Sequence, residues 1–141
     1  DNIIVGTGAK TLPMSNTGIY VTGGRGMTII RNQISHIADG IGILLSAEHD
    51  TISDCHVSGN IISDCDRTGI QLSPGNNGTL ADNYVHGNVL RRIHGRGIYV
   101  DAANTDVDGN NVADCDWEPF FEAGAPNRTK WGRNISVRCK K

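Results

Sequence analysis

The chain has 141 residues and a formal net charge of −2, and only 5% of its residues are aromatic. This charge balance lacks the basic footprint of a nucleic-acid-binding protein, so we expect no nucleic-acid partner. No apolar run approaches the ~20 residues of a membrane-spanning helix, so we expect no membrane partner either. The length suits one domain with its own core. Glycine occurs 18 times and asparagine 13 times, and both residues tolerate the backbone of sharp turns.

A short motif recurs along the chain and predicts one β-strand in each repeat. The motif reads Gly-Ile-x-Val or a close variant, and it falls at residues 17–21, 42–45, 68–72, 96–100 and 119–122. Alternation at period two, β-branched residues and flanking glycines are typical of strands.

A second motif is centred on an asparagine, at Asn32, Asn60, Asn88, Asn110 and Asn134. The residue three places before it is Ile29, Val57, Val85, Val107 or Trp131. The residue five places after it is Ile37, Cys65, Ile93, Cys115 or Cys139. Successive asparagines are 28, 28, 22 and 24 residues apart. A fixed apolar pattern with spacers of variable length indicates stacked structural repeats.

One segment also fits a helix, because residues 83–94 would place Val85, Leu90 and Ile93 on one helical face. Gly87 and Gly95 disfavour that alternative, since each costs about 1 kcal/mol inside a helix. The equivalent segments of other repeats carry β-branched residues at the same positions. We therefore predict strands here as well.

Repeats of 22–30 residues are too short to bury an apolar face alone. Winding them into a coil places each strand on its counterpart one turn later, at about 4.8 Å, and gives a parallel β-helix. We predict an all-β fold with one domain over residues 1–141 and about five coils, of which residues 1–16 form an incomplete first coil and residues 17–139 the repeated coils. The asparagines are expected to form a hydrogen-bonded ladder along the axis.

The two ends of such a coil expose unpaired strand edges, which proteins normally cap. We therefore predict that the chain is a segment of a longer β-helix, or that a partner covers its ends, as in a homotrimer.

The four cysteines have two possible interpretations. Cysteines on neighbouring coils could lie within the ~7 Å that a disulfide requires. However, Ile93 separates Cys65 from Cys115 in the predicted column, and Cys55 falls level with the apolar Met27. We favour free, buried thiols that act as small apolar residues. Zinc binding is disfavoured because no Cys-x-x-Cys or paired His/Cys spacing occurs, and we expect no metal and no cofactor.

A polar position follows each motif asparagine by four residues and holds His36, Asp64, Arg92, Asp114 and Arg138. The last four alternate in sign, so we predict a surface ladder of ion pairs in preference to a site for anionic substrates. Exposed pairs of this kind contribute about 0–1 kcal/mol each.

The repeated segments Gly-Ile-Tyr-Val and Gly-Asn-x-Val-x-Asp-Cys resemble the coil signature of the right-handed parallel β-helix superfamily, of the pectate-lyase-like type. The resemblance covers about residues 17–139. It implies a right-handed coil and activity on carbohydrates, as in polysaccharide lyases, glycoside hydrolases, epimerases and phage tailspike depolymerases. Of the polygalacturonase motifs only Asn104-Thr105-Asp106 matches, and we expect it in a turn. The paired aspartates and the Gly-His-Gly and Arg-Ile-Lys motifs are missing.

Residues between two inward positions of a strand point outward. In the Gly-Ile-x-Val strands these are Tyr20, Leu44, Gln71, Tyr99 and Phe121. Aromatic surface beside hydrogen-bonding groups suits sugar rings, so we predict Tyr20, Gln71, Tyr99 and Phe121 as substrate-binding residues. The alternative is that the aromatic residues shelter under loops or a partner chain.

Long loops follow the second and third of these strands and would overhang this stripe. Hydrolysis of a glycosidic bond typically needs two carboxyl groups, and Asp101 with Glu48 or Asp50 is predicted to supply them. A lyase needs a base that removes the proton α to a carboxylate, and His49 is the candidate. Solvated loop residues without a catalytic role are the alternative.

Two functions remain open at this point. The first is a carbohydrate-active β-helix that acts on an extracellular polysaccharide by hydrolysis or elimination. The second is a non-catalytic stalk or attachment module, such as a tailspike or adhesin segment. Both imply an extracellular location, either secreted or on a virion surface.

Overall fold

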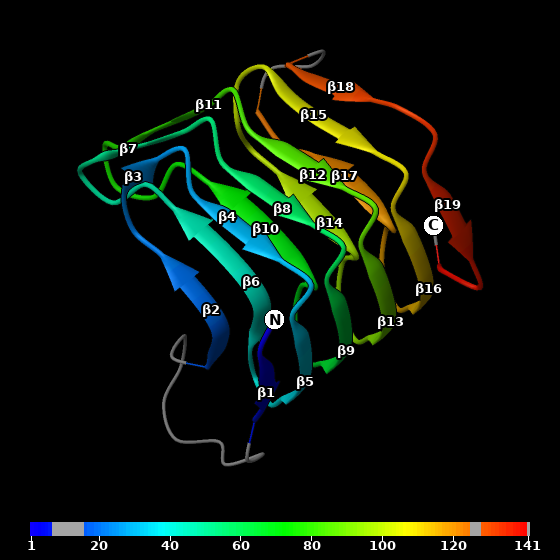
Figure 1. Ribbon diagram of the computed structural model, residues 1–141. Helices are drawn as coiled ribbons and strands as arrows, with labels where there is room; N and C mark the ends of the chain where they lie inside the picture. Colours follow the sequence, from blue (N-terminus) through cyan, green and yellow to red (C-terminus); the bar gives the residue numbers. More distant parts are fainter. Residues whose placement is uncertain (7–15, 125–127, 141) are drawn as a thin grey trace.

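The computed structural model describes residues 1–6, 16–124 and 128–140. Within these ranges the chain winds into a coil of short parallel strands, and none of the described residues is helical. Figure 1 shows the strands of successive coils lying beside one another along the axis. The strands form four parallel sheets, named A to D here.

Sheet A contains, in spatial order, β1 (Ile3–Val5), β5 (Gln33–Ile37), β9 (Ile61–Cys65), β13 (Val89–Ile93), β16 (Asn111–Cys115) and β19 (Ile135–Val137). Sheet B contains β2 (Thr17–Val21), β6 (Ile41–Ser46), β10 (Ile70–Ser73), β14 (Ile98–Val100) and β17 (Phe120–Glu122). Sheet C contains β3 (Gly24–Arg25), β7 (Thr51–Ser53) and β11 (Thr79–Ala81). Sheet D contains β4 (Thr28–Ile30), β8 (His56–Ser58), β12 (Tyr84–His86), β15 (Thr105–Asp108) and β18 (Thr129–Trp131).

This architecture confirms the predicted parallel β-helix. The helical alternative for residues 83–94 is wrong, because this segment forms β12 and β13. The predicted registers are also confirmed: Val57 pairs with Ile29 and Val85, and Ile93 pairs with Cys65 and Cys115.

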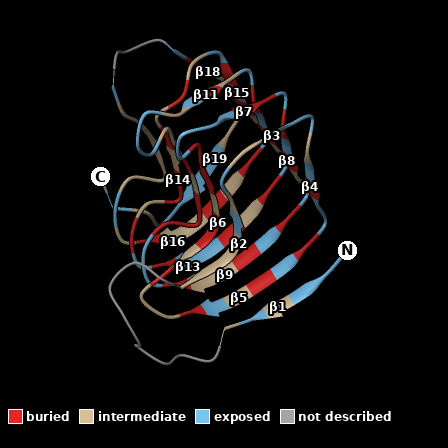
Figure 2. Cartoon of the chain, turned by 90° about the vertical axis from the view of Figure 1, so that its left-hand side faces the viewer, coloured by how far each residue is buried: buried red, intermediate tan, exposed pale blue. Residues whose placement is uncertain are grey.

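Side chains of like kind lie over one another inside the coil. In sheet A, Ile34, Ile62 and Leu90 form one inward column, and each is at most 1% exposed. In β5, Ile34 and Ile37 are buried whereas Gln33 and His36 are exposed, and Figure 2 shows bands of red and pale blue along this strand. The apolar core is therefore a set of parallel columns along the axis.

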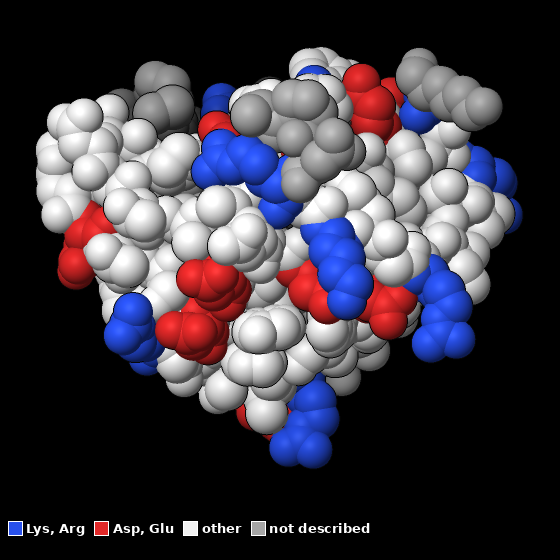
Figure 3. All heavy atoms as spheres, turned by 90° about the horizontal axis from the view of Figure 1, so that it is seen from above, with Lys and Arg blue, Asp and Glu red and all other residues white. Residues whose placement is uncertain are grey.

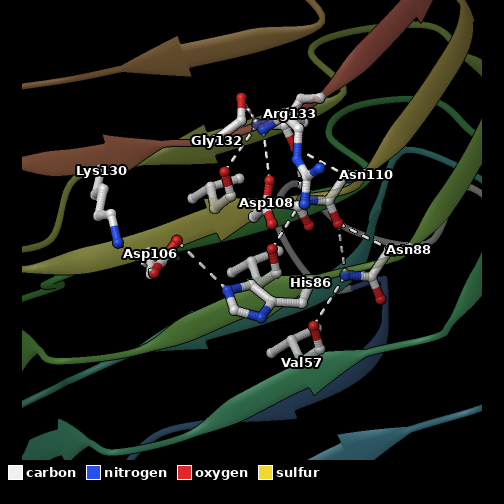
Figure 4. Close-up of polar contacts among 12 residues, drawn as sticks. Val57, His86, Asn88, Asp106, Asp108, Asn110, Lys130, Gly132 and Arg133 are labelled. Atoms are coloured by element: carbon white, nitrogen blue, oxygen red, sulfur yellow. Dashed lines mark hydrogen bonds and ion pairs between the residues drawn. The ribbon is translucent and has the colours of Figure 1, made fainter.

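The asparagine ladder is also confirmed. Asn60 Nδ2 donates to Asn88 Oδ1 at 2.9 Å. Asn88 Nδ2 donates to Asn110 Oδ1 at 2.9 Å and to the Val57 carbonyl at 2.9 Å (Figure 4). The same contacts continue from Asn2 through Asn32 and on to Asn134. In Asn60, Asn88 and Asn110 the side-chain amide thus bonds both its neighbour in the ladder and the backbone at the corner between sheets D and A, whereas Asn2 donates only to Asn32.

The cysteines differ partly from the expectation. Cys55 and Cys65 are free and buried, as predicted. Burial, with a smaller contribution from the charge of Asp64, raises the pKa of Cys65 to about 12, so this thiol is unreactive at neutral pH. The expectation is wrong for Cys115 and Cys139, which form a disulfide with a Cα–Cα distance of 4.5 Å. They occupy the same inward position on adjacent coils, with no apolar residue between them.

The polar position four residues after each ladder asparagine is a left-handed bend. His36, Asp64, Arg92, Asp114 and Arg138 all have positive φ, between 52° and 60°. The pairing of β13 with β16 skips Arg92, since Arg91 pairs with Ala113 and Ile93 with Cys115. The bend therefore places two outward residues between two inward ones. Its repetition in every coil stabilises the left-handed backbone conformation, which L residues otherwise avoid.

The charged side chains at these bends form separate pairs. Arg92 donates from Nε and Nη2 to the two oxygens of Asp64, at 2.6 and 2.8 Å, and Arg138 pairs in the same way with Asp114. Among the described residues no ion pair joins Arg92 to Asp114. The predicted ladder is therefore two bidentate pairs rather than one continuous series.

The Asp64–Arg92 pair predicts a pH-dependent contribution to stability. The hydrogen bond from Arg92 lowers the pKa of Asp64 from 3.8 to about 2. Because the pKa of Asp64 is lower in the folded state than in the unfolded state, ionised Asp64 stabilises the folded state at pH values above the unfolded pKa. This contribution is lost as pH falls from about 3.8 to about 2. The Arg92→Gln variant is therefore expected to unfold at lower urea concentration than the parent at pH 6, and the difference should shrink across that acidic range. Arg91→Gln is the control. If the difference in unfolding midpoint between Arg92→Gln and the parent were the same at pH 6 and in the acidic range, the assignment would be contradicted.

Candidate functional site

The outward stripe predicted on the Gly-Ile-x-Val strands lies on the outer face of sheet B. The register places Tyr20, Leu44, Gln71, Tyr99 and Phe121 at one position of successive coils. These five side chains follow one another along the axis in the order of the coils. Ser46 and Ser73 pair at the position two residues further on.

A groove with a volume of about 740 Å³ crosses this face. It extends over β2, β6 and β10 to the turns that precede β14 and β17, so it runs along the axis of the coil. We call it the sheet B groove. It is lined by Asn16, Thr17, Tyr20, Asp39, Gly40, Ile41, Leu44, Ser46, Glu48, Asp66, Arg67, Thr68, Gln71, Ser73, His94, Gly95, Arg96 and Trp117.

Glu48 is the predicted catalytic residue that lines this groove. The Tyr20 hydroxyl donates to Glu48 Oε1 at 2.7 Å, and Ser46 Oγ lies 3.5 Å from the same oxygen. The hydrogen bond to Glu48, with partial burial, raises the pKa of Tyr20, so its hydroxyl stays protonated and donates at neutral pH. A carboxylate fixed by a tyrosine in a polar groove is suited to proton transfer.

The other three predicted catalytic residues lie outside the lining of the groove. Asp101 Oδ1 lies 3.8 Å from Arg128 Nη1. Asp50 Oδ1 accepts the backbone N–H of Thr51 at 2.7 Å. His49 is exposed and has a positive φ of 66°. The structure therefore brings Glu48 together with Tyr20 and Gln71, whereas it does not bring Asp101, His49 and Asp50 into the same groove.

Tyr99 and Phe121 are predicted substrate-binding residues that also lie outside the lining of the groove. Their rings stack with centroids 5.5 Å apart. The guanidinium carbon of Arg96 lies 4.1 Å from the Phe121 ring centroid, 5.0 Å from that of Trp117 and 5.8 Å from that of Tyr99. These three rings form what we call the Arg96 cage. The side chain of Arg96, rather than solvent, therefore covers part of the aromatic surface.

The groove residues at the turn between sheets A and B were not predicted from the sequence. Asp39, Asp66, Arg67, His94 and Trp117 come from this turn in successive coils, and all line the groove. They follow the inward Ile or Cys position by one or two residues, so the register of the repeats already showed that these residues lie at one turn of successive coils. Their relation to the groove could not be read from alternation, because turn residues do not follow period two.

A second polar cluster lies on the outer face of sheet D. The His56 and Tyr84 rings stack at 4.6 Å, and His86 Nε2 lies 3.5 Å from Asp106 Oδ1 (Figure 4). Lys130 Nζ lies 3.4 Å from the other oxygen of Asp106. Asp106 belongs to the Asn104-Thr105-Asp106 motif, of which Thr105 and Asp106 lie on β15 rather than in the expected turn. The motif is therefore on a different sheet from the groove.

Figure 3 shows the face formed by the upper loops of Figure 1, where acidic and basic residues are interspersed. In residues 1–6, 16–124 and 128–140, no group of three or more His, Cys, Asp or Glu side chains is arranged to hold a metal ion. The same residues contain no helix of the length and apolar character needed to cross a membrane.

Comparison with known proteins assigns the family. No curated protein and no solved structure matches the chain. A family model described as "right handed beta helix region" matches residues 1–118, which is most of the chain. This match agrees with the parallel sheets and the asparagine ladder, and the chain belongs to the right-handed β-helix family.

Proposed function

We propose that this protein binds an extracellular polysaccharide in the sheet B groove and cleaves it there. The observation that carries the proposal is the groove itself, which follows the axis across several coils. Hydroxyl, amide, carboxylate and aromatic groups line it together. An elongated groove with such a lining fits a chain of sugar rings, whose hydroxyls form hydrogen bonds and whose C–H faces pack on apolar surface.

Glu48 is the proposed proton-transfer group. It is the groove-lining carboxylate that accepts the Tyr20 hydroxyl, and both hydrolysis and elimination require a group that accepts or donates a proton at the scissile bond. Ser46, Ser73 and Gln71 are placed to orient sugar hydroxyls on the same face. In this proposal Asp101, His49 and Asp50 do not contact the scissile bond.

The disulfide supports an extracellular location. Disulfides persist in oxidising compartments and are rare in the cytosol. Cys115–Cys139 links two coils, and its buried Cys115 and partly buried Cys139 pack with the apolar core, where the bond stabilises the fold.

A non-catalytic attachment module is the second candidate. It is favoured by two observations: only one of the four predicted catalytic residues lines the groove, and Arg96 covers the aromatic rings. Such a module binds the glycan without cleaving it. A homotrimer or a longer parent chain remains a prediction for this case.

The test is incubation of the protein with a panel of neutral and acidic polysaccharides, with binding, new reducing ends and unsaturated products all measured. Glu48→Gln is expected to lower turnover by about 100-fold or more while binding persists. Glu122→Gln is the matched control, since Glu122 accepts the backbone N–H groups of Arg128 and Thr129 outside the groove. Binding without products would support the attachment module. Loss of turnover in Asp101→Asn but not in Glu48→Gln would refute the assignment of Glu48, and absence of any binding would refute the proposed function.

A further inference from the structure

The outer face of sheet A carries exposed apolar side chains. Its six strands lie side by side along the axis (Figure 2). Among the described residues, nine large apolar side chains are exposed, and five of them lie on this face: Ile3, Val5, Ile61, Ile135 and Val137. Ile3 is 75% exposed and Ile135 is 59% exposed. Apolar side chains that gather on one face of a folded chain are typical of an interaction surface.

The strand register arranges the outward residues of this face in two columns along the axis. In coil order, the first column holds Ile3, Gln33, Ile61, Val89, Asn111 and Ile135. The second holds Val5, Ser35, Ser63, Arg91, Ala113 and Val137. We call these residues the sheet A face. The first column has the same order of apolar and amide side chains in both directions, and the second begins and ends with valine.

This order fits a two-fold axis that passes between β9 and β13 and runs parallel to the strands. Such an axis sets a second copy of the chain face to face with the first and reverses its coil order. Ile61 then faces Val89 of the partner subunit, and Gln33 faces Asn111 of the partner subunit. Apolar residues thus meet apolar residues, and amides meet amides. A two-fold interface requires a self-complementary patch of this kind.

The charged bends beside the face follow the same symmetry. Asp64 and Arg92 form an ion pair within one chain. The two-fold axis sets this pair against the same pair of the second copy in the opposite direction, so that each carboxylate faces a second guanidinium. His36 likewise faces Asp114 of the partner subunit. At the corner that precedes the strands, Asp1 faces Arg133 of the partner subunit. Opposite charges therefore meet along both sides of the face.

A two-fold axis parallel to the coil axis gives a poorer match. It places each coil opposite the same coil of the second copy, and each bend opposite a corner. Arg138 would then lie near Arg133 of the partner subunit, and Arg91 would face the apolar Val89. Like charges and an unpaired arginine against an apolar side chain both disfavour association. The charge pattern therefore favours coils that run in opposite directions.

The size of the face indicates a reversible interface. Five strand spacings of about 4.8 Å give a length of about 24 Å, and seven residues from corner to bend give a width of about 23 Å. The face therefore covers about 550 Å² per copy, which is near the lower end for specific interfaces. We expect a dissociation constant in the micromolar range.

We propose that two copies of this chain associate through the sheet A face, with antiparallel coils and a two-fold axis between β9 and β13. Apolar residues form the centre of this interface and charged residues its rim, as in many protein interfaces. The sheet B groove lies on a different sheet, so this inference is independent of the proposed function.

The first experiment measures the mass of the protein by sedimentation equilibrium between about 1 µM and 1 mM. A monomer–dimer equilibrium is expected for the parent. Ile61→Lys places a charge at the centre of the interface and is expected to raise the dissociation constant at least about tenfold. Ile30→Lys is the matched control, because Ile30 is an exposed isoleucine on the outer face of sheet D. Urea unfolding verifies that both variants are folded.

The second experiment tests the direction of the coils with a short bismaleimide crosslinker. Packed sheets lie about 10 Å apart, so Gln33→Cys and Asn111→Cys in different copies should be joined when the two variants are mixed. Residue 33 of one copy and residue 33 of the other are three coils apart, or about 14 Å along the axis, so Gln33→Cys alone should be joined much less. The parent, whose free Cys55 and Cys65 are buried, is the control.

Four results would overturn the inference. The parent could stay monomeric at about 1 mM, or it could form a trimer. The two lysine variants could weaken association equally. The crosslinker could join Gln33→Cys alone as well as it joins the mixture. Activity and glycan binding would be unaffected by each of these results.

Discussion

Asn88→Ala is expected to lower the free energy of unfolding by about 2–4 kcal/mol, because the substitution removes the centre of a buried hydrogen-bonded ladder. Asn88 is fully buried, and its Oδ1 accepts both the backbone N–H and the side-chain amide of Asn60, at 3.0 and 2.9 Å. Alanine would leave that backbone N–H without its partner, in a place that water cannot reach. The Val57 carbonyl and Asn110 Oδ1 would each lose one donor as well.

The control for this variant is Asn2→Ala at the edge of the same ladder. Asn2 is exposed and donates only to Asn32 Oδ1, so its loss is expected to cost less than about 1 kcal/mol. Urea unfolding followed by circular dichroism measures both changes. Similar losses for the two variants would show that the ladder does not stabilise the coil through burial of its amides.

Ile62→Ala is expected to destabilise the fold by about 2–5 kcal/mol. Ile62 is fully buried in the central column of sheet A, between Ile34 and Leu90 on the adjacent coils. On its other side it packs against the backbone of sheet B: a Cβ added to Gly42 would lie 2.6 Å from Ile62 Cγ2. Truncation would open a cavity between two sheets that the surrounding strands cannot close.

The adjacent residue provides a matched control. Ile61 lies on the same strand with the opposite orientation and is 50% exposed, so Ile61→Ala is expected to cost less than about 1 kcal/mol. The comparison uses one residue type, one strand and one substitution, and it isolates burial as the variable. If Ile61→Ala proved the more destabilising of the two, the assigned faces of β9 would be reversed.

The repeat made most of the fold predictable. Each inward position is specified several times over, so one ambiguous segment, such as residues 83–94, is settled by its counterparts. The predicted columns through Val57 and Ile93 are confirmed for this reason. The additional bend that separates sheet C from sheet D was not predicted. It depends on left-handed residues, such as Asp54 and Asp82 with φ of 54° and 56°, which break no apolar pattern.

The candidate site was less predictable, because it depends on how side chains at turns are oriented. Periodicity correctly placed Tyr20 and Gln71 on the outer face of sheet B, and both line the groove. It could not show that Arg96 reaches across the rings of Tyr99 and Phe121, because a long flexible side chain has no direction fixed by strand alternation. The roles of the predicted catalytic and binding residues stay predictions until activity is measured.

The disulfide illustrates a different limit. Cys115 and Cys139 occupy the same position on adjacent coils, a geometry that suits a covalent bond as well as two packed thiols. Burial preference alone favoured the thiols. Two cysteines in one column can form a disulfide only when no other residue lies between them. Ile93 lies between Cys65 and Cys115 and keeps those two apart.

The position of this crosslink also makes the order of unwinding asymmetric. A solenoid whose coils contact only their neighbours loses structure from its termini inward. The bond between Cys115 and Cys139 closes a loop across 24 residues and fastens β19 to β16, whereas in the described residues no such fastening joins β1 to β5. Under heat or mechanical tension β19 should therefore stay attached to β16 in the oxidised protein, and a reducing agent should let the two strands separate.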